Sequence, residues 1–184
     1  MSLGRIRSSR LPALSRSARE RELRNMAISW PPMVRRGPRV TDAQIRAFEQ
    51  SFGHSLPDDY RQFLLDVNGG RLDRANREFD LGVVNRLFSL EDTEDDSRDL
   101  ATQADRERAW LPSPDLLVIG HDDGGNTLLL ALAGEHRGEV WYMLTGDDAR
   151  PDDANPRVLW HDRRDMRKLA TSFEQFMRAL RPLS

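Results

Sequence analysis

The stretch VTDAQIRAFEQSFGHSLPDDYRQFLLDVNGG, residues 40–70, predicts two helices in succession. Thr41 opens a capping box, in which side chains satisfy the backbone N–H groups of the first turn. Apolar residues then recur at spacings of three and four, and Gly53 suits the left-handed conformation that ends many helices. Pro57 starts the second helix, where its missing N–H is no loss, and Asn-Gly-Gly at 68–70 ends it. Because isolated helices of this length are marginal in water, both need a surface to pack against.

Downstream, the spacing of apolar residues changes to that of strands. The segment REFDLGVV, residues 77–84, places Phe79, Leu81 and Val83 on alternate positions, which predicts one half-buried strand. Further strands are expected at RLFSL (86–90), which continues or pairs with the first, and at LLVIG (116–120), TLLLAL (127–132), EVWYML (139–144) and, as an edge, RVLW (157–160). A capping box at Ser172 starts a last helix. This order indicates an α+β domain with a mostly antiparallel sheet of about five or six strands, flanked by helices.

Composition narrows the class of protein. The 184 residues contain no cysteine, which excludes disulfides and thiolate metal sites, and no apolar run reaches the length of a membrane span. We therefore expect a single cytoplasmic domain that does not contact a membrane. Arginine outnumbers lysine by 27 to one, which is typical of a GC-rich coding sequence and favours a bacterial source.

Charge is distributed unevenly along the chain. Residues 1–27 hold seven arginines and two glutamates, which leaves residues 28–184 with a net charge of −7 within a total of −2. An acidic folded part disfavours nucleic acid as a partner. We expect residues 1–37 to be a disordered Arg/Ser-rich tail and residues 38–184 to form the domain.

The segment GHDDGGN, residues 120–126, has residue types that bind metals, hold phosphates or form tight turns. A metal-dependent hydrolase that used His121, Asp122 and Asp123 would need three or four converging ligands. In an extended segment Asp122 points away from the other two, and the second pair, His161-Asp162, falls at a strand or loop position rather than on the helices of HD-type phosphohydrolases. A phosphate loop needs glycines that open a helix, whereas these precede a strand. We therefore interpret the segment as a turn between two central strands, and predict no catalytic residue, metal or cofactor.

Several of these motifs, taken in order, resemble the SUKH superfamily. Within it the match is to the Smi/Knr branch, which is related to a yeast regulator of cell-wall assembly. The family's glycine-ended helix, Leu-Pro start and Asn-Gly-Gly end are similar to residues 53–70. Its strand–loop–strand unit, next strand and closing helix resemble LLVIGHDDGGNTLLLAL (116–132), GEVWYM (138–143) and SFEQFMRAL (172–180). The likeness covers about residues 38–182, and Asn126 departs from the Asp of many members, which puts in doubt any role that needs a charge there.

The resemblance implies a protein-binding fold rather than an enzyme. Many bacterial members are thought to be immunity proteins, which bind and neutralise a toxin made by the same cell or its kin. We therefore expect a bacterial immunity protein that neutralises a cognate toxin, such as a nuclease, by stoichiometric binding. Two alternatives stay open: a scaffold or regulatory SUKH protein in signalling or cell-wall synthesis, as in fungal relatives, and the metal-dependent hydrolase described above.

Two acidic runs, residues 91–99 and 147–153, suit a basic partner such as a toxin domain. Opposed charges speed encounter and reject wrong partners. Exposed ion pairs contribute little affinity, so aromatic anchors are also required. The predicted partner-binding residues are Glu91, Asp92, Glu94, Asp95, Asp96, Trp110, Asp122, Asp123, Asp147, Asp148 and Trp160.

Overall fold

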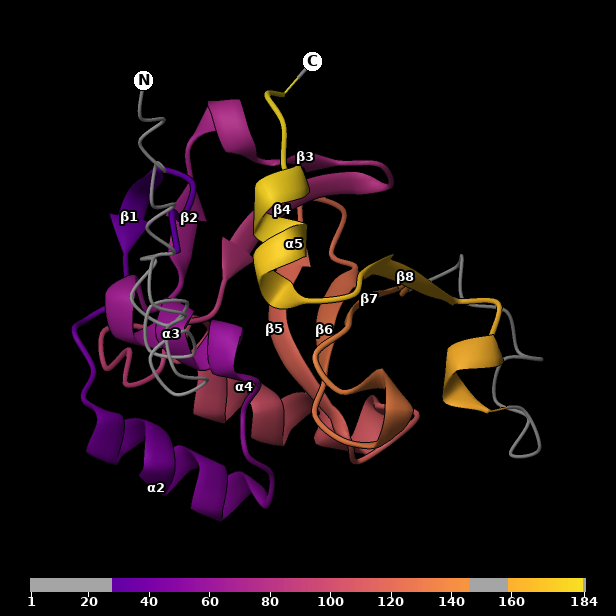
Figure 1. Ribbon diagram of the computed structural model, residues 1–184, viewed down its shortest axis with the longest axis horizontal. Coiled ribbons are helices and arrows are strands. Elements are labelled where there is room, and N and C mark those ends of the chain that lie inside the picture. The colour runs from indigo at the N-terminus through magenta and orange to yellow at the C-terminus, as the bar shows by residue number, and fades with distance from the viewer. Residues whose placement is uncertain (1–27, 146–158, 184) are drawn as a thin grey trace, which may run out of the picture.

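The computed structural model describes residues 28–145 and 159–183, which form an antiparallel sheet accompanied by helices (Figure 1). The strand order is β1-β2-β4-β5-β6-β7-β8, and β3 pairs with β4 outside this path. Every pair of neighbours is antiparallel. The strands are β1 (Met33–Arg36), β2 (Gly70–Leu72), β3 (Glu78–Phe79), β4 (Gly82–Leu87), β5 (Leu116–Asp122), β6 (Thr127–Ala131), β7 (Val140–Met143) and β8 (Met166–Ala170). The predicted α+β class is confirmed, with more strands than the five or six expected.

The additional strands are short and polar. β1 is MVRR, β2 is GRL and β8 is MRKLA, so none shows the alternation of apolar residues that identifies a half-buried strand. β1 also lies within the segment expected to be a disordered tail. Trp30 belongs to the fold as well, because its ring packs on Phe63 and Phe173 and its Nε1 donates to Asp66 at 3.0 Å. The ordered domain therefore begins before residue 38.

Two strand predictions are wrong in detail. Residues 77–84 do not form one strand, because the chain turns at Asp80 and Leu81 and pairs Glu78 with Val83 in a hairpin. Leu81 is consequently 49% exposed, and its place in the apolar alternation is accidental. The expected edge strand at 157–160 lies partly outside the described residues, and its last residue, Trp160, starts a 3₁₀ helix, η6 (Trp160–Asp162). The sheet edge is β8 instead.

Four α-helices accompany the sheet within the described residues: α2 (Asp42–Phe52), α3 (Asp58–Asp66), α4 (Leu100–Glu107) and α5 (Phe173–Ala179). Both hydrogen bonds of the capping box are present: the Thr41 side chain accepts from the Gln44 amide, and the Gln44 side chain accepts from the Thr41 amide. Gly53 ends α2 in the left-handed conformation with φ 92°. Ser172 caps α5 by accepting from the Gln175 amide at 3.1 Å. The Gln175 side chain returns to Thr171, one residue before the expected position. The predicted starts of α2 and α5 are therefore confirmed.

Helices cover the sheet from both sides. Neighbouring residues of a strand point to opposite faces. On one face, His121 lies against Glu107 of α4. On the other face, Asp122 contacts Tyr142, whose ring packs on Phe79, and Phe79 in turn packs on α5. Figure 1 shows α5 lying in front of the sheet. Because both faces are covered, all residues of β6 and β7 are buried.

Candidate functional site

The GHDDGGN segment is a turn between neighbouring strands, as predicted. β5 continues through Asp122, and β6 begins at Thr127. Asp122 is only 5% exposed. Its Oδ1 accepts from the Asn126 amide at 2.7 Å, and its Oδ2 accepts from Asn126 Nδ2 at 3.1 Å and from the Tyr142 hydroxyl at 2.6 Å. Asp122 therefore holds the turn together, and its burial removes it from the predicted partner-binding residues.

The amide of Asn126 fits this arrangement. Nδ2 donates to Asp122 and to the Tyr142 hydroxyl, the latter at 2.7 Å, while Oδ1 accepts from the Thr145 amide at 3.0 Å. A carboxylate at this position would have no proton to donate to Asp122. Asn126 thus has a local structural role.

The other two members of the suggested hydrolase site point to different partners. His121 Nε2 lies 2.8 Å from Glu107 Oε1 on α4. Asp123 is half exposed and accepts two hydrogen bonds from Arg77 Nη2, both of 3.0 Å. His121, Asp122 and Asp123, here named the β5–β6 cluster, therefore do not converge on a shared site.

The first acidic run lies before α4 and is partly neutralised. Glu94 pairs with Arg35 at 2.9 Å, and Asp95 pairs with Arg98 at 2.6 Å. Hydrogen bonds from Ser97, followed by the charge of Arg98, lower the pKa of Asp95 below its ordinary value. Because Arg35 and Arg98 offset the charges of Glu94 and Asp95, the negative potential of this run is weaker than its composition indicates.

Burial divides the same run further. Asp92 is 8% exposed, and its amide donates to the Asp99 side chain that caps α4. Its burial removes it, like Asp122, from the predicted contact residues. Glu91, Glu94 and Asp96 are exposed.

Trp110 is the most exposed large apolar residue of the described chain, at 81%. It ends the 3₁₀ helix η2 (Arg108–Trp110), which follows α4 directly. The exposed acids of the run precede α4, and Asp105 is exposed on α4 itself. The helix α4 therefore connects the acidic run to the Trp110 indole. We define the α4 surface as Glu91, Glu94, Asp96, Asp105 and Trp110. Arg106 and Arg108 are also exposed here, which makes its Trp110 end mixed in charge.

The second acidic run and Trp160 have different outcomes. Asp147 and Asp148 lie outside the described residues. Trp160 is half-buried and packs edge-on against Trp141, with ring centroids 4.9 Å apart. It also contacts the ring of His136 at 5.2 Å. Trp160 thus belongs mainly to an internal aromatic group rather than to an open surface.

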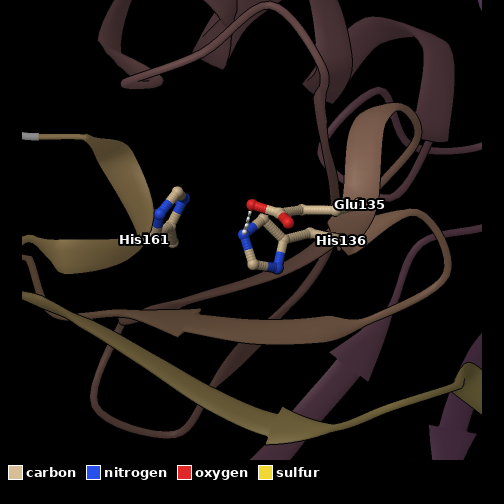
Figure 2. Close-up of side chains that lie close together, drawn as sticks. All are labelled: Glu135, His136 and His161. Carbon is tan, nitrogen blue, oxygen red and sulfur yellow. Dashed lines mark ion pairs between the residues drawn. The ribbon is translucent and has the colours of Figure 1, made fainter.

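A second group of polar residues was missed by the sequence reasoning. Glu135 and His136 lie in the 3₁₀ helix η3 (Gly134–His136) between β6 and β7, and His161 lies in η6. One ligand atom from each lies within 4.8 Å of the others. Figure 2 shows the three side chains facing one another. We name this group the η3–η6 cluster.

The chain matches a known family over most of its length. The sequence model of the family described as "SMI1 / KNR4 family (SUKH-1)" matches residues 39–179. The chain belongs to the SMI1/KNR4 family (SUKH-1). This confirms the resemblance inferred from the motifs over about residues 38–182. A search of curated proteins found no significant match.

The Asn-Gly-Gly motif of this SUKH-1 domain has a clear physical role. Asn68 has φ 57°, and its Nδ2 donates to the carbonyls of Pro38 and Leu90, both at 2.7 Å. A Cβ on Gly69 would lie 2.2 Å from the Phe88 carbonyl oxygen, and one on Gly70 would lie 2.1 Å from that of Arg35. Both glycines are therefore required where the end of α3 meets β1 and β4.

SUKH-1 membership supports a binding role over a catalytic one, because the superfamily is for the most part non-catalytic. In the part of the chain that the structure describes, each helix is too short or too polar to cross a bilayer.

Proposed function

We propose that this SUKH-1 domain is a bacterial, cytoplasmic immunity-type protein that neutralises a cognate toxin by stoichiometric binding. The observation that carries the proposal is the indole of Trp110, 81% exposed at the end of α4. Tryptophan is enriched among residues that dominate binding energy, because its large ring loses much water contact in an interface. A solvent-exposed tryptophan on a binding fold is therefore a reasonable anchor for a partner.

The acids beside α4 would act mainly on the rate of encounter. Exposed ion pairs contribute about 0.2–1 kcal/mol each, so they do not supply the affinity. Glu91 and Asp96 have no ion pair within the described residues, unlike Glu94 and Asp95, and are open to a basic partner. The proposal extends to Asp147 and Asp148 as further acids, and to half-exposed Asp123 beside the β5–β6 turn.

The direct test is co-expression. The C-terminal domain encoded by the gene next to this one is expressed in cells with and without the protein. Protection from killing, together with a one-to-one complex on a sizing column, is the expected result. Equal killing in both strains with no complex would overturn the proposal, and several stable non-toxic partners in a pull-down would favour the scaffold alternative.

A matched pair of variants then locates the interface. Trp110→Ala should weaken the complex by about 2 kcal/mol, roughly thirtyfold, as expected for an anchor residue. Leu81→Ala is the control, since Leu81 is also exposed but lies on the β3–β4 hairpin, far from α4 in Figure 1. Equal affinity of both variants, measured by calorimetry, would place the interface elsewhere.

Charge reversal separates steering from anchoring. Replacing Glu91 and Asp96 with lysine should slow association and flatten its dependence on salt, with a smaller change in the dissociation rate. Stopped-flow mixing at several salt concentrations measures both rates. An unchanged association rate would remove the α4 surface from the proposal.

A further inference from the structure

The η3–η6 cluster has the hydrogen-bond pattern of a prepared metal site. His136 Nδ1 lies 3.0 Å from Glu139 Oε2, so this nitrogen donates to the carboxylate and Nε2 is left as the lone-pair nitrogen. In proteins, metal-binding histidines commonly donate their other ring N–H to a carboxylate, which fixes the tautomer and orients the ring. Glu139 therefore stands where such an outer carboxylate is needed.

Glu139 is itself firmly held. Its Oε2 accepts from Trp141 Nε1 at 3.1 Å, and its Oε1 accepts from Lys168 Nζ at 3.1 Å. The Glu139 carboxylate thus keeps the His136 ring in place.

Two nitrogen atoms of the cluster lack a hydrogen-bond partner within the described residues, although His136 Nε2 lies near the Glu135 carboxylate. His136 Nε2 and His161 Nδ1 are buried and accept or donate no hydrogen bond within the described residues. Buried polar atoms are normally satisfied, and each exception requires an explanation. A bound cation would satisfy both imidazoles at once.

The spacing already approaches that of a coordination sphere. Two ligand atoms bound at 2.0–2.1 Å to a tetrahedral zinc ion are separated by roughly 3.4 Å. The distance from His136 Nε2 to Glu135 Oε1 is 3.6 Å. The His161 ligand atom lies within 4.8 Å of the other two, so each of these separations has to shorten by at most about 1.4 Å to complete the set.

We propose that Glu135, His136 and His161 bind one divalent transition-metal ion, with Zn²⁺ the best match. Two imidazoles and one carboxylate favour zinc, copper or nickel over magnesium and calcium, which prefer oxygen ligands. Three protein ligands leave one tetrahedral position for water or for a ligand from a partner. The site is separate from the α4 surface and does not depend on the proposed toxin.

Such an ion would join two connections of the fold. η3 belongs to the β6–β7 connection, and η6 precedes β8. The bound ion would therefore restrain η6 against the β6–β7 hairpin and stabilise the folded state, because it binds the folded chain and not the dispersed ligands of the unfolded one.

Titration of the untagged protein with Zn²⁺, followed by calorimetry, tests the proposal. We expect one ion per chain with micromolar or tighter affinity, and at least a tenfold loss in His136→Gln and in His161→Gln. The matched controls are His54→Gln and His121→Gln, which change histidines outside the cluster and should keep wild-type affinity. Glu135→Gln should also weaken binding, and because this side chain is 82% exposed the variant keeps its fold.

Co²⁺ provides an independent readout. Tetrahedral coordination by two nitrogen atoms and one oxygen gives visible d–d bands that are absent without the site, and these should disappear in Glu135→Gln and His161→Gln. Far-ultraviolet circular dichroism of the metal-free variants verifies that they are folded. Absence of micromolar Zn²⁺ binding, or binding of equal strength in the wild type and in Glu135→Gln and His161→Gln, would overturn the proposal.

Discussion

The domain holds two groups of histidine and carboxylate side chains that differ in how their polar atoms are used. In the β5–β6 cluster, Asp122 has both oxygens occupied, and His121 and Asp123 each have a partner on another element. In the η3–η6 cluster, two buried nitrogen atoms have no hydrogen-bond partner within the described residues. The cluster that looks like an active site in the sequence is closed, whereas the one assembled from distant segments is open to a ligand.

Removing Asp122 should have the largest effect on stability. Asp122→Ala leaves the Tyr142 hydroxyl and the Asn126 side chain without their shared buried acceptor. Hydrogen bonds to a charged group contribute about 1.5–3 kcal/mol each, so we expect a loss of about 3–4 kcal/mol in the free energy of unfolding. Urea denaturation measures it.

The control for Asp122→Ala is Asp80→Ala. Asp80 pairs with Arg181 at 2.9 Å but is 85% exposed, so its removal should change stability by no more than about 0.5 kcal/mol. A loss below about 1 kcal/mol for Asp122→Ala would show that the β5–β6 cluster is not the closed, structural group described above.

Asn126→Asp should destabilise the turn by about 1–2 kcal/mol at pH 7, because it replaces a donor to Asp122 with a second carboxylate. One of the two carboxyls would then take up a proton as the pH falls. The deficit relative to wild type should therefore shrink between pH 7 and pH 5, which denaturation at both values measures. A pH-independent deficit would contradict this explanation.

Glu139→Gln should cost about 1 kcal/mol at pH 7, because it weakens the hydrogen bonds from Lys168 and His136. The pKa of Glu139 is lowered in the folded state, so its contribution is fully present above the ordinary value of 4.5 and is lost as the pH falls through the folded value. Wild type and variant should therefore converge in stability in acid. Parallel curves down to low pH would contradict the assignment.

His161→Phe should have the smallest effect. Phenylalanine keeps the ring contacts with Trp160 and His136 and removes a buried nitrogen that has no partner within the described residues. In metal-free protein we expect a change within about 1 kcal/mol, of either sign, in the free energy of unfolding. A loss of more than about 2 kcal/mol would mean that this nitrogen is satisfied by the fold itself.

Much of the fold could be predicted from local signals. The cap at Thr41, the stop at Gly53 and the apolar strands β5, β6 and β7 are each determined by residues within one element. β1, β2 and β8 could not, because their short polar sequences become strands only by pairing with a neighbour. The hairpin at Asp80 and Leu81 was hidden because an accidental alternation of apolar residues continued across it.

The two clusters show the same limit for function. Asp, Asn and Gly within one short segment identify the β5–β6 turn, since their hydrogen bonds are local. His136 and His161 are 25 positions apart, so no spacing in the sequence relates them. They come together because of the 3₁₀ helix η6 and the strand β8, neither of which was predicted. The exposure of Trp110 and the burial of Asp92 likewise depend on packing rather than on residue type.

The position of Phe173 has a consequence for synthesis of the protein. Its ring is enclosed by Trp30, Tyr60 and Phe63, with the last two centroids 4.8 Å away. The ribosome makes those three aromatic residues long before it makes Phe173. Until α5 has left the ribosome, they form an uncovered apolar surface on the nascent chain, which is the kind of surface that chaperones hold. The domain therefore completes its core only after α5 has emerged from the ribosome.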